Sequence, residues 1–261
     1  MAVNDYDYSI FSAWVSDRSR PEEIGARFLE LLDRLGRIDP VFRGWEFVPL
    51  QPDDPDLLDD DGPPILPSKD NIAELVLENV ARDDFWQPDP DEGYRPLALT
   101  QPPDPSRSMH LSVTAGSRWN NKADLRAGGY KAPLADDLVR YPLFREALLA
   151  IVAIWRPAWA RVQGFKMETE HIPRGALTEI GTKSQHRMTW MAYLSADLSK
   201  DLKLPSRLHT ELTPDGGLLM IAAAERLDPD NAEHMAFSDA LTAMMAERRP
   251  EPAPISPPLR S

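Results

Sequence analysis

Histidine and glutamate residues in the second half of the chain have side chains that could support metal chemistry. They are Glu168, Glu170, His171, His186, His209 and Glu211. Imidazole and carboxylate groups are the ligands that zinc, iron and manganese take in proteins. Side chains two residues apart on a strand share a face, so Glu168 would lie beside Glu170 and His209 beside Glu211. A four-group metal site is therefore conceivable.

The spacing of this set argues against such a site. It contains no HExxH-like motif and no facial-triad spacing, and exposed polar positions on half-buried strands account for it more simply. We therefore expect no metal and no other cofactor. A metal-dependent enzyme stays as the alternative, with ligands drawn from His171, His186, His209 and Glu211.

A second candidate site lies in the first half, where carboxylates are interleaved with large aromatic side chains. It consists of Asp83, Asp84, Trp86, Asp89, Asp91, Glu92 and Tyr94. Aromatic side chains anchor protein interfaces, whereas charges steer and select the partner. We expect the neighbouring Phe85 to fill the core after a helix that ends near Arg82, and Trp86 suits the core and an interface equally. The segment is thus a candidate surface for binding another protein.

Other chemistries lack the residues that they need. The chain has no cysteine, which excludes disulfides, thiol nucleophiles, cysteine-ligated zinc and iron–sulfur clusters. The glycine pairs Gly128-Gly129 and Gly216-Gly217 lack the spacing of a phosphate-binding loop. No Gly-x-Ser-x-Gly motif is present either, so nucleotide binding and acyl transfer have no support.

The chain carries a net charge of −13, which is distributed unevenly. Residues 1–105 contain 24 acidic and 9 basic side chains, a net charge of −15, whereas residues 106–261 have a net charge of +2. A protein of this charge repels nucleic acid and anionic membranes. We therefore expect it to bind neither.

Much of the acidity lies in residues 51–67, where six aspartates crowd between prolines. Such a composition cannot bury apolar area, so we expect a solvated loop that folding does not require. Docking onto a basic partner is the alternative role. The spacing lacks the glycine and the final glutamate of an EF-hand loop, which excludes that kind of calcium site.

The N-terminus and the longest apolar run indicate in which cellular compartment the protein lies. The N-terminus has neither a basic segment nor an apolar stretch, and the longest apolar run, Ala147–Trp155, has nine residues. A membrane helix needs about 20 apolar residues, and a secretory signal needs both of the missing features. We therefore expect a cytoplasmic protein without a membrane segment.

Apolar residues that recur at intervals of three and four predict four helices. They are Ile24–Ile38 after Pro21, a segment from a Ser68 cap to Val80, Phe144–Trp155, and a last segment that opens at Pro229 and includes Met245. Because Phe144–Trp155 is apolar nearly all round, we expect it to be a central, buried helix.

Short aromatic or β-branched runs predict the strands. They are Tyr8–Val15, Trp45–Val48, Met109–Thr114, Phe165–Ile172, Thr189–Leu194, His209–Leu212 and Leu218–Ala223. The turn residues Asp215-Gly216-Gly217 predict that the last two form a hairpin. This order favours an α+β fold, in which a mixed, largely antiparallel sheet packs with amphipathic helices and one central buried helix.

The domain organisation follows from composition. We expect one domain over residues 1–248, with a division into an acidic part, 1–105, and a second part, 106–248, as the alternative. Residues 249–261 contain five prolines, and we expect them to form a disordered tail.

The tryptophans divide into two groups. Those within predicted helices and strands should be structural, and they are Trp14, Trp45, Trp155 and Trp190. Trp119 falls in the polar stretch Ser117–Asn121 and suits either a lid or a binding surface.

Four stretches, taken in their order along the chain, carry a family resemblance. They are Ile38-Asp39-Pro40 with Phe42-Arg43-Gly44-Trp45, Asp83-Asp84-Phe85 with Gly93-Tyr94, Trp190-Met191-Ala192-Tyr193-Leu194-Ser195, and Leu204-Pro205 with Asp215-Gly216-Gly217-Leu218-Leu219. Over most of residues 8–246 the chain resembles the immunity protein 52 family. That family is encoded beside toxins in bacterial polymorphic-toxin and type VI secretion loci, commonly next to a restriction-endonuclease-like nuclease toxin.

The resemblance implies a protein that acts by binding. The family therefore implies no catalytic residue and no cofactor for this chain. Trp45 and Trp190 match positions that maintain the fold in this family, and they do not indicate a contact site. The implied partner is a cognate toxin, a nuclease effector, whose positive cleft an acidic protein can cover. Toxin neutralisation is therefore the first hypothesis, with a metal-dependent enzyme and an acidic adaptor or effector chaperone as alternatives.

Overall fold

The computed structural model describes residues 6–15, 18–49, 64–128, 134–166 and 187–248. Within these residues nine strands form one antiparallel sheet in the order β2-β3-β4-β5-β1-β6-β7-β9-β8. The strands are β1 (Tyr6–Trp14), β2 (Trp45–Phe47), β3 (Leu97–Thr100), β4 (Met109–Thr114), β5 (Asn121–Ala127), β6 (Trp159–Lys166), β7 (Arg187–Leu194), β8 (His209–Leu212) and β9 (Leu218–Ile221). The first strand in the chain therefore lies near the middle of the sheet.

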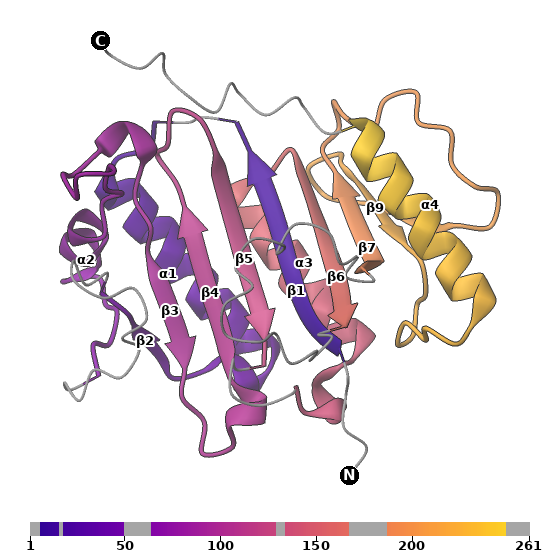
Figure 1. Ribbon diagram of the computed structural model, residues 1–261, viewed down its shortest axis with the longest axis horizontal. Coiled ribbons are helices and arrows are strands. Elements are labelled where there is room, and N and C mark those ends of the chain that lie inside the picture. The colour runs from indigo at the N-terminus through magenta and orange to yellow at the C-terminus, as the bar shows by residue number, and fades with distance from the viewer. Residues whose placement is uncertain (1–5, 16–17, 50–63, 129–133, 167–186, 249–261) are drawn as a thin grey trace, which may run out of the picture.

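Helices cover the two faces of the sheet unequally. The described residues contain α1 (Pro21–Ile38), α2 (Ile72–Glu78), α3 (Tyr141–Trp155) and α4 (Ala232–Arg248). In Figure 1, α1 and α3 lie behind the sheet, whereas α4 lies in front of its β7–β9 end. Helices and an antiparallel sheet confirm the α+β fold predicted from the sequence.

The main core lies between the sheet and the helices α1 and α3. Strand β1 directs alternate side chains toward it, and the rings of Tyr8 and Phe144 are 5.6 Å apart. Farther along the strand, Trp14 stacks on Trp155 with 5.2 Å between the ring centroids. All four tryptophans expected to be structural are buried, which confirms that prediction; they are Trp14, Trp45, Trp155 and Trp190.

The ends of α1 and α3 follow local rules. Pro21 opens α1, and the backbone N–H of Arg20 donates to the Glu23 carboxylate at 3.0 Å, which satisfies an amide at the start of the helix. Helix α3 begins at Tyr141, so Pro142 lies within its first turn, where a missing N–H costs nothing. Most of the side chains of α3 are buried, as its all-round apolarity predicts.

Three helix starts differ from the prediction, and α3 begins at Tyr141, three residues before the predicted Phe144. The Ser68 hydroxyl donates to the Asn71 side chain at 3.0 Å and therefore does not cap α2, which begins at Ile72 and ends before Val80. The last helix begins at Ala232 and not at Pro229, because Asn231 is its cap. The Asn231 side chain accepts hydrogen bonds from the backbone N–H groups of Glu233 and His234.

The strand predictions are partly confirmed. Met109–Thr114 has the predicted bounds, and β8 and β9 form the predicted hairpin. Strands β3 and β5 were not predicted from the sequence, and β6 begins at Trp159, six residues before the predicted start at Phe165. The end of the expected acidic loop also belongs to the sheet edge, since the Phe47 N–H donates to the Ile65 carbonyl at 2.8 Å.

Several expectations fall outside the described residues. They concern residues 50–63 of the acidic loop, the part of the predicted strand Phe165–Ile172 beyond β6, and the tail 249–261. No helix in the described part of the chain is long and apolar enough to cross a membrane.

Candidate functional site

The interleaved acidic and aromatic residues lie on one excursion between α2 and β3, which we call the acidic-aromatic loop (residues 82–94). Backbone hydrogen bonds close its base, from the Ala81 N–H to the Gly93 carbonyl at 2.8 Å and from the Asp89 N–H to the Ala81 carbonyl at 2.7 Å. Tyr94 is half-buried and exchanges backbone hydrogen bonds with Ala115. The loop is therefore attached to the sheet at a defined position.

The tip of the loop is fixed by Asp83. One oxygen of its carboxylate accepts the backbone N–H groups of Phe85 and Gln87, both at 2.9 Å. The Trp86 N–H donates to the Asp83 carbonyl at 3.0 Å, and the Arg82 guanidinium donates to the Trp86 carbonyl at 2.9 Å. Asp83 thus serves the turn itself, which is the known preference of aspartate at such positions.

The two aromatic side chains at the tip point into solvent. Phe85 is 83% exposed and Trp86 is 50% exposed. The expectation that Phe85 fills the core is therefore wrong, because the chain reverses at Asp83 before it could reach the core. Trp86 also has a φ of +60°, which non-glycine residues rarely adopt.

The second half of the loop contacts the turn that follows β4. The Asp89 carboxylate accepts the Asp91 N–H at 3.0 Å, and the Asp91 carbonyl accepts the Arg118 N–H at 2.8 Å. The Arg118 guanidinium lies 3.6 Å from the Asp91 carboxylate and 5.1 Å from the Trp119 ring centroid. Gly93 permits this approach, since a Cβ there would lie 2.5 Å from the Ala115 carbonyl oxygen.

Trp119 belongs to this neighbouring turn. Its backbone N–H and that of Asn120 donate to the Ser117 hydroxyl, each at 3.1 Å. The Asn121 side chain accepts from the Ser117 N–H at 2.9 Å and donates to its carbonyl at 3.0 Å. Trp119 therefore lies on a hydrogen-bonded turn beside the acidic-aromatic loop.

The charge of the loop is largely uncompensated. Within the described residues, Arg118 pairs with Asp91, and no cation pairs with the carboxylates of Asp84, Asp89 or Glu92. Asp84 is exposed, and Asp89 and Glu92 are half-buried. Unpaired carboxylates beside exposed aromatic rings are suited to a partner surface that carries positive charge.

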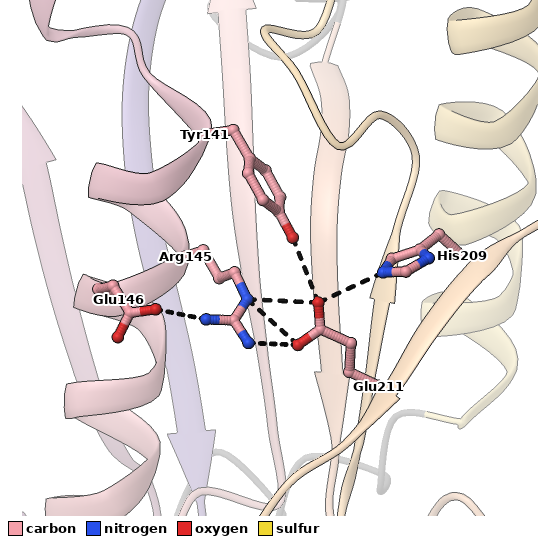
Figure 2. Close-up of polar contacts among 5 residues, drawn as sticks. All are labelled: Tyr141, Arg145, Glu146, His209 and Glu211. Atoms are coloured by element: carbon pink, nitrogen blue, oxygen red, sulfur yellow. Dashed lines mark hydrogen bonds and ion pairs between the residues drawn. The ribbon is translucent and has the colours of Figure 1, made fainter.

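Two members of the other candidate set, His209 and Glu211, fall on β8, where they face side chains of α3 (Figure 2). His209 and Glu211 share a face of β8, and the His209 Nε2 lies 3.3 Å from a Glu211 oxygen. The Arg145 Nε donates to the Glu211 carboxylate at 3.1 Å, and the Tyr141 hydroxyl donates to it at 3.4 Å. The hydrogen bond from Arg145 holds the pKa of Glu211 below its usual value.

This arrangement gives Glu211 a structural role. Its negative charge is met by Arg145, which also contacts Glu146, so the cluster fastens the edge hairpin to α3. In the part of the chain that the structure describes, no three His, Asp or Glu side chains gather as metal ligands would. Glu168, Glu170, His171 and His186 lie outside that part.

Sequence reasoning missed two members of the first site. Phe85 was assigned to the core, and Arg118 was not connected with the loop. The signal for Phe85 was present, because an aspartate two residues before it favours a turn that keeps its side chain outside. The contact between Asp91 and Arg118 joins two turns that only the sheet brings together, so no local pattern could reveal it.

An α+β protein that presents exposed aromatic and acidic side chains on a fixed loop falls in the class of proteins suited to binding another protein. Comparison with known families narrows this class, because the model of immunity protein 52 matches residues 7–248. The chain belongs to the immunity protein 52 family. Membership of this family supports an immunity role for the chain, in which its partner is a toxin.

A solved structure shares the fold. It is described as the Pseudomonas aeruginosa T6SS protein PA0821, and it matches with a TM-score of 0.54 and 11% sequence identity over 94% of this chain and 76% of that one. At this identity the likeness concerns the fold alone. No curated protein matches the chain.

Proposed function

We propose that this chain is an immunity protein that neutralises a cognate antibacterial nuclease toxin by forming a stoichiometric complex with it in the cytoplasm of the producing cell. Membership of the immunity protein 52 family supports the binding of a toxin. The observation that carries the proposed contact region is the acidic-aromatic loop, a hydrogen-bonded turn with two exposed rings and with carboxylates that pair with no cation among the described residues.

The charge of the chain supports a nuclease as the target. A nuclease must present a positively charged cleft to phosphate groups, and an acidic protein that covers this cleft competes with nucleic acid by charge and by shape. The net charge of −15 on residues 1–105 has the required sign. The loop belongs to this acidic part of the chain.

The two kinds of side chain in the loop have separable roles. Unpaired carboxylates such as Asp84 and Glu92 attract a basic partner over distance and raise the association rate. Phe85 and Trp86 supply apolar area that is desolvated only in the complex, so they slow dissociation. Because hydrogen bonds already fix the tip, little conformational freedom is lost on binding.

Co-expression of the chain with the toxin encoded beside its gene tests the proposal. We compare Asp84→Asn with Glu92→Gln in one variant against a control that carries Glu233→Gln and Asp239→Asn on α4. Both variants lose the same charge, but only the first removes it from the loop. The wild-type chain and the control should rescue growth fully, and the loop variant should rescue it less.

The physical counterpart is the association rate measured at several salt concentrations. The loop variant should bind more slowly, with a flatter salt dependence than the control, because screening has less charge to act on. Full rescue by the loop variant together with an unchanged rate would remove the loop from the interface. Failure of the wild-type chain to bind the neighbouring toxin would overturn the immunity role itself.

A further inference from the structure

An open groove of about 860 Å³ runs along α3 on the face of the sheet that carries α1. Leu149 and Ala153 of α3 line the part that we call its floor. Arg34 and Ile38 of α1 also line the groove, as does the turn between β8 and β9, which we call its hairpin wall. This volume lies in the range of protein ligand sites. The groove is separate from the acidic-aromatic loop, since the residues that line the groove include none of residues 82–94.

Polar contacts hold the hairpin wall of this groove in place. Arg145 and Glu211 fasten β8 to α3, as Figure 2 shows. Near the tip of the hairpin, the Asp215 carboxylate accepts from the Tyr193 hydroxyl at 2.6 Å and from the Thr213 hydroxyl at 2.5 Å. Gly217 allows the close packing, because a Cβ there would lie 2.4 Å from the Tyr193 ring. The groove is therefore formed before any partner arrives.

The shape of the floor suits a helix. The lining residues of α3 recur at intervals of three and four from Glu146 through Leu149 to Ala153, and Arg156 follows as the C-cap of the helix. Ten residues of helix rise about 15 Å, which is about three turns. Apolar side chains occupy the middle of this stripe and charged ones its ends, which is the pattern of a groove that receives an amphipathic helix.

The charged residues that line the groove further limit which kind of segment could bind in it. Three of the charged lining residues are paired within the chain, Arg34 with Glu30, Glu146 with Arg145, and Asp197 with Lys200. Asp215 and Arg156 have no ion pair in the described part of the chain. Burial acts to raise the pKa of Asp215, but the hydrogen bonds from Thr213 and Tyr193 outweigh it, so this pKa lies below its usual value. An anion and a cation that form no ion pair in the described residues fit a partner segment with charges of both signs.

We propose that this groove is a second contact surface, which seats an amphipathic helix of the toxin with its apolar side on Leu149 and Ala153, a Lys or Arg at Asp215 and an Asp or Glu at Arg156. The inference rests on the proposed function only in that the occupant belongs to the toxin. A helix of mixed charge differs from the basic cleft proposed to meet the acidic-aromatic loop. The two surfaces would therefore contact different parts of one toxin.

A single cysteine tests the occupant directly, because the natural chain has none. Ala153 and Ala243 are both exposed helical alanines, but Ala243 lies on α4, away from the groove. The probe is the toxin domain encoded beside the gene for this chain, in a variant without catalytic activity. In the complex, the thiol of Ala153→Cys should react with a maleimide at least tenfold more slowly than in the free chain, whereas that of Ala243→Cys should react at an unchanged rate.

The substitution Ala153→Arg provides a second measurement, with Ala243→Arg as its matched control. Both place a good helix-forming residue at an exposed position, so both variants should keep the wild-type melting temperature. Only Ala153→Arg should weaken binding, by at least tenfold, and Arg156→Gln should weaken it less. A complex in which the thiol of Ala153→Cys stays fully reactive and Ala153→Arg binds normally would overturn the groove inference while the proposed function stands.

Two further outcomes would also contradict the inference. If the wild-type chain forms no complex with the toxin domain, the proposed function fails and the inference fails with it. If the thiol of Ala153→Cys becomes protected without toxin as the concentration of the chain rises, the occupant is a second copy of this chain.

Discussion

Trp86 combines two features that are each uncommon in a folded protein. Its side chain is half exposed, and its backbone has a φ of +60°. Non-glycine residues in this left-handed region cost about 1 to 2 kcal/mol, and such strain concentrates at functional sites. Under the proposed function, the strained turn holds Trp86 and Phe85 where a partner can reach them.

This strain predicts an inverted order of stability between two variants. Glycine in place of alanine normally destabilises a protein, but at a positive φ it relieves strain. We expect Trp86→Gly to be more stable than Trp86→Ala by about 1 kcal/mol, measured by denaturant unfolding. Both should dissociate from the toxin faster than the wild-type chain. The opposite order of stability would show that the turn relaxes once the indole is removed.

Single residues also show how far the sequence could be interpreted. Composition pointed to the acidic-aromatic segment, because carboxylates and aromatic rings alternate there. It could not tell that Asp83 turns its carboxylate onto its own backbone while Asp84 faces solvent. The two aspartates are neighbours of identical chemistry, and only the path of the turn distinguishes them.

The β8–β9 hairpin is the element whose attachment matters most for the proposed groove. It forms one edge of the sheet, and its β8 strand has β9 as its single strand neighbour in the described residues. The contacts from Arg145 and Tyr141 to Glu211 fasten it to α3. Asp215, Gly216 and Gly217 predicted the hairpin from the sequence. Its contact with α3 could not be predicted in this way, because the two lie more than 60 residues apart along the chain.

The ion pair at Glu211 predicts a pH dependence. The pKa of Glu211 is lower in the folded chain than in the unfolded chain, where it is about 4.3. Its contribution to stability is therefore complete above the unfolded value and is lost as the pH falls through the folded value. We expect Glu211→Gln to lower the free energy of unfolding by about 1 kcal/mol at pH 7 and by less at pH 3.

Glu146→Gln is the matched control, because Glu146 also contacts Arg145 but does not join α3 to β8. Its effect on the free energy of unfolding at pH 7 should be smaller. An equal effect of Glu211→Gln at pH 3 and pH 7 would show that the carboxylate charge does not hold the hairpin.

Strand β5 shows why some elements could not be predicted. Its sequence Asn-Lys-Ala-Asp-Leu-Arg-Ala contains small and charged residues in place of the aromatic and β-branched ones that mark a strand. Pairing with β1 and β4 nevertheless places it within the sheet, where its successive side chains point to opposite faces and their burial alternates. Tertiary pairing outweighs the weak local preference here.

The whole molecule joins parts of unequal charge in one sheet. Strand β1, from the acidic part of the chain, pairs with β5 and β6 of the second part, and Tyr8 lies opposite both Ala127 and Gly164. Such long-range pairing leaves no local trace, so the helices and the α+β class could be predicted but the strand order could not. The unequal charge of residues 1–105 and 106–261 could be read from the sequence directly.

Titration of the toxin's activity shows whether this chain neutralises a nuclease in a stoichiometric complex. The purified toxin encoded beside the gene for this chain is mixed with increasing amounts of the chain, and cleavage of nucleic acid is measured. We expect a linear fall to zero activity at one chain per toxin, and we expect a variant that combines Phe85→Ala with Trp86→Ala to be needed in larger amounts. Full toxin activity in the presence of excess folded wild-type chain would show that the chain is not an inhibitor of this toxin.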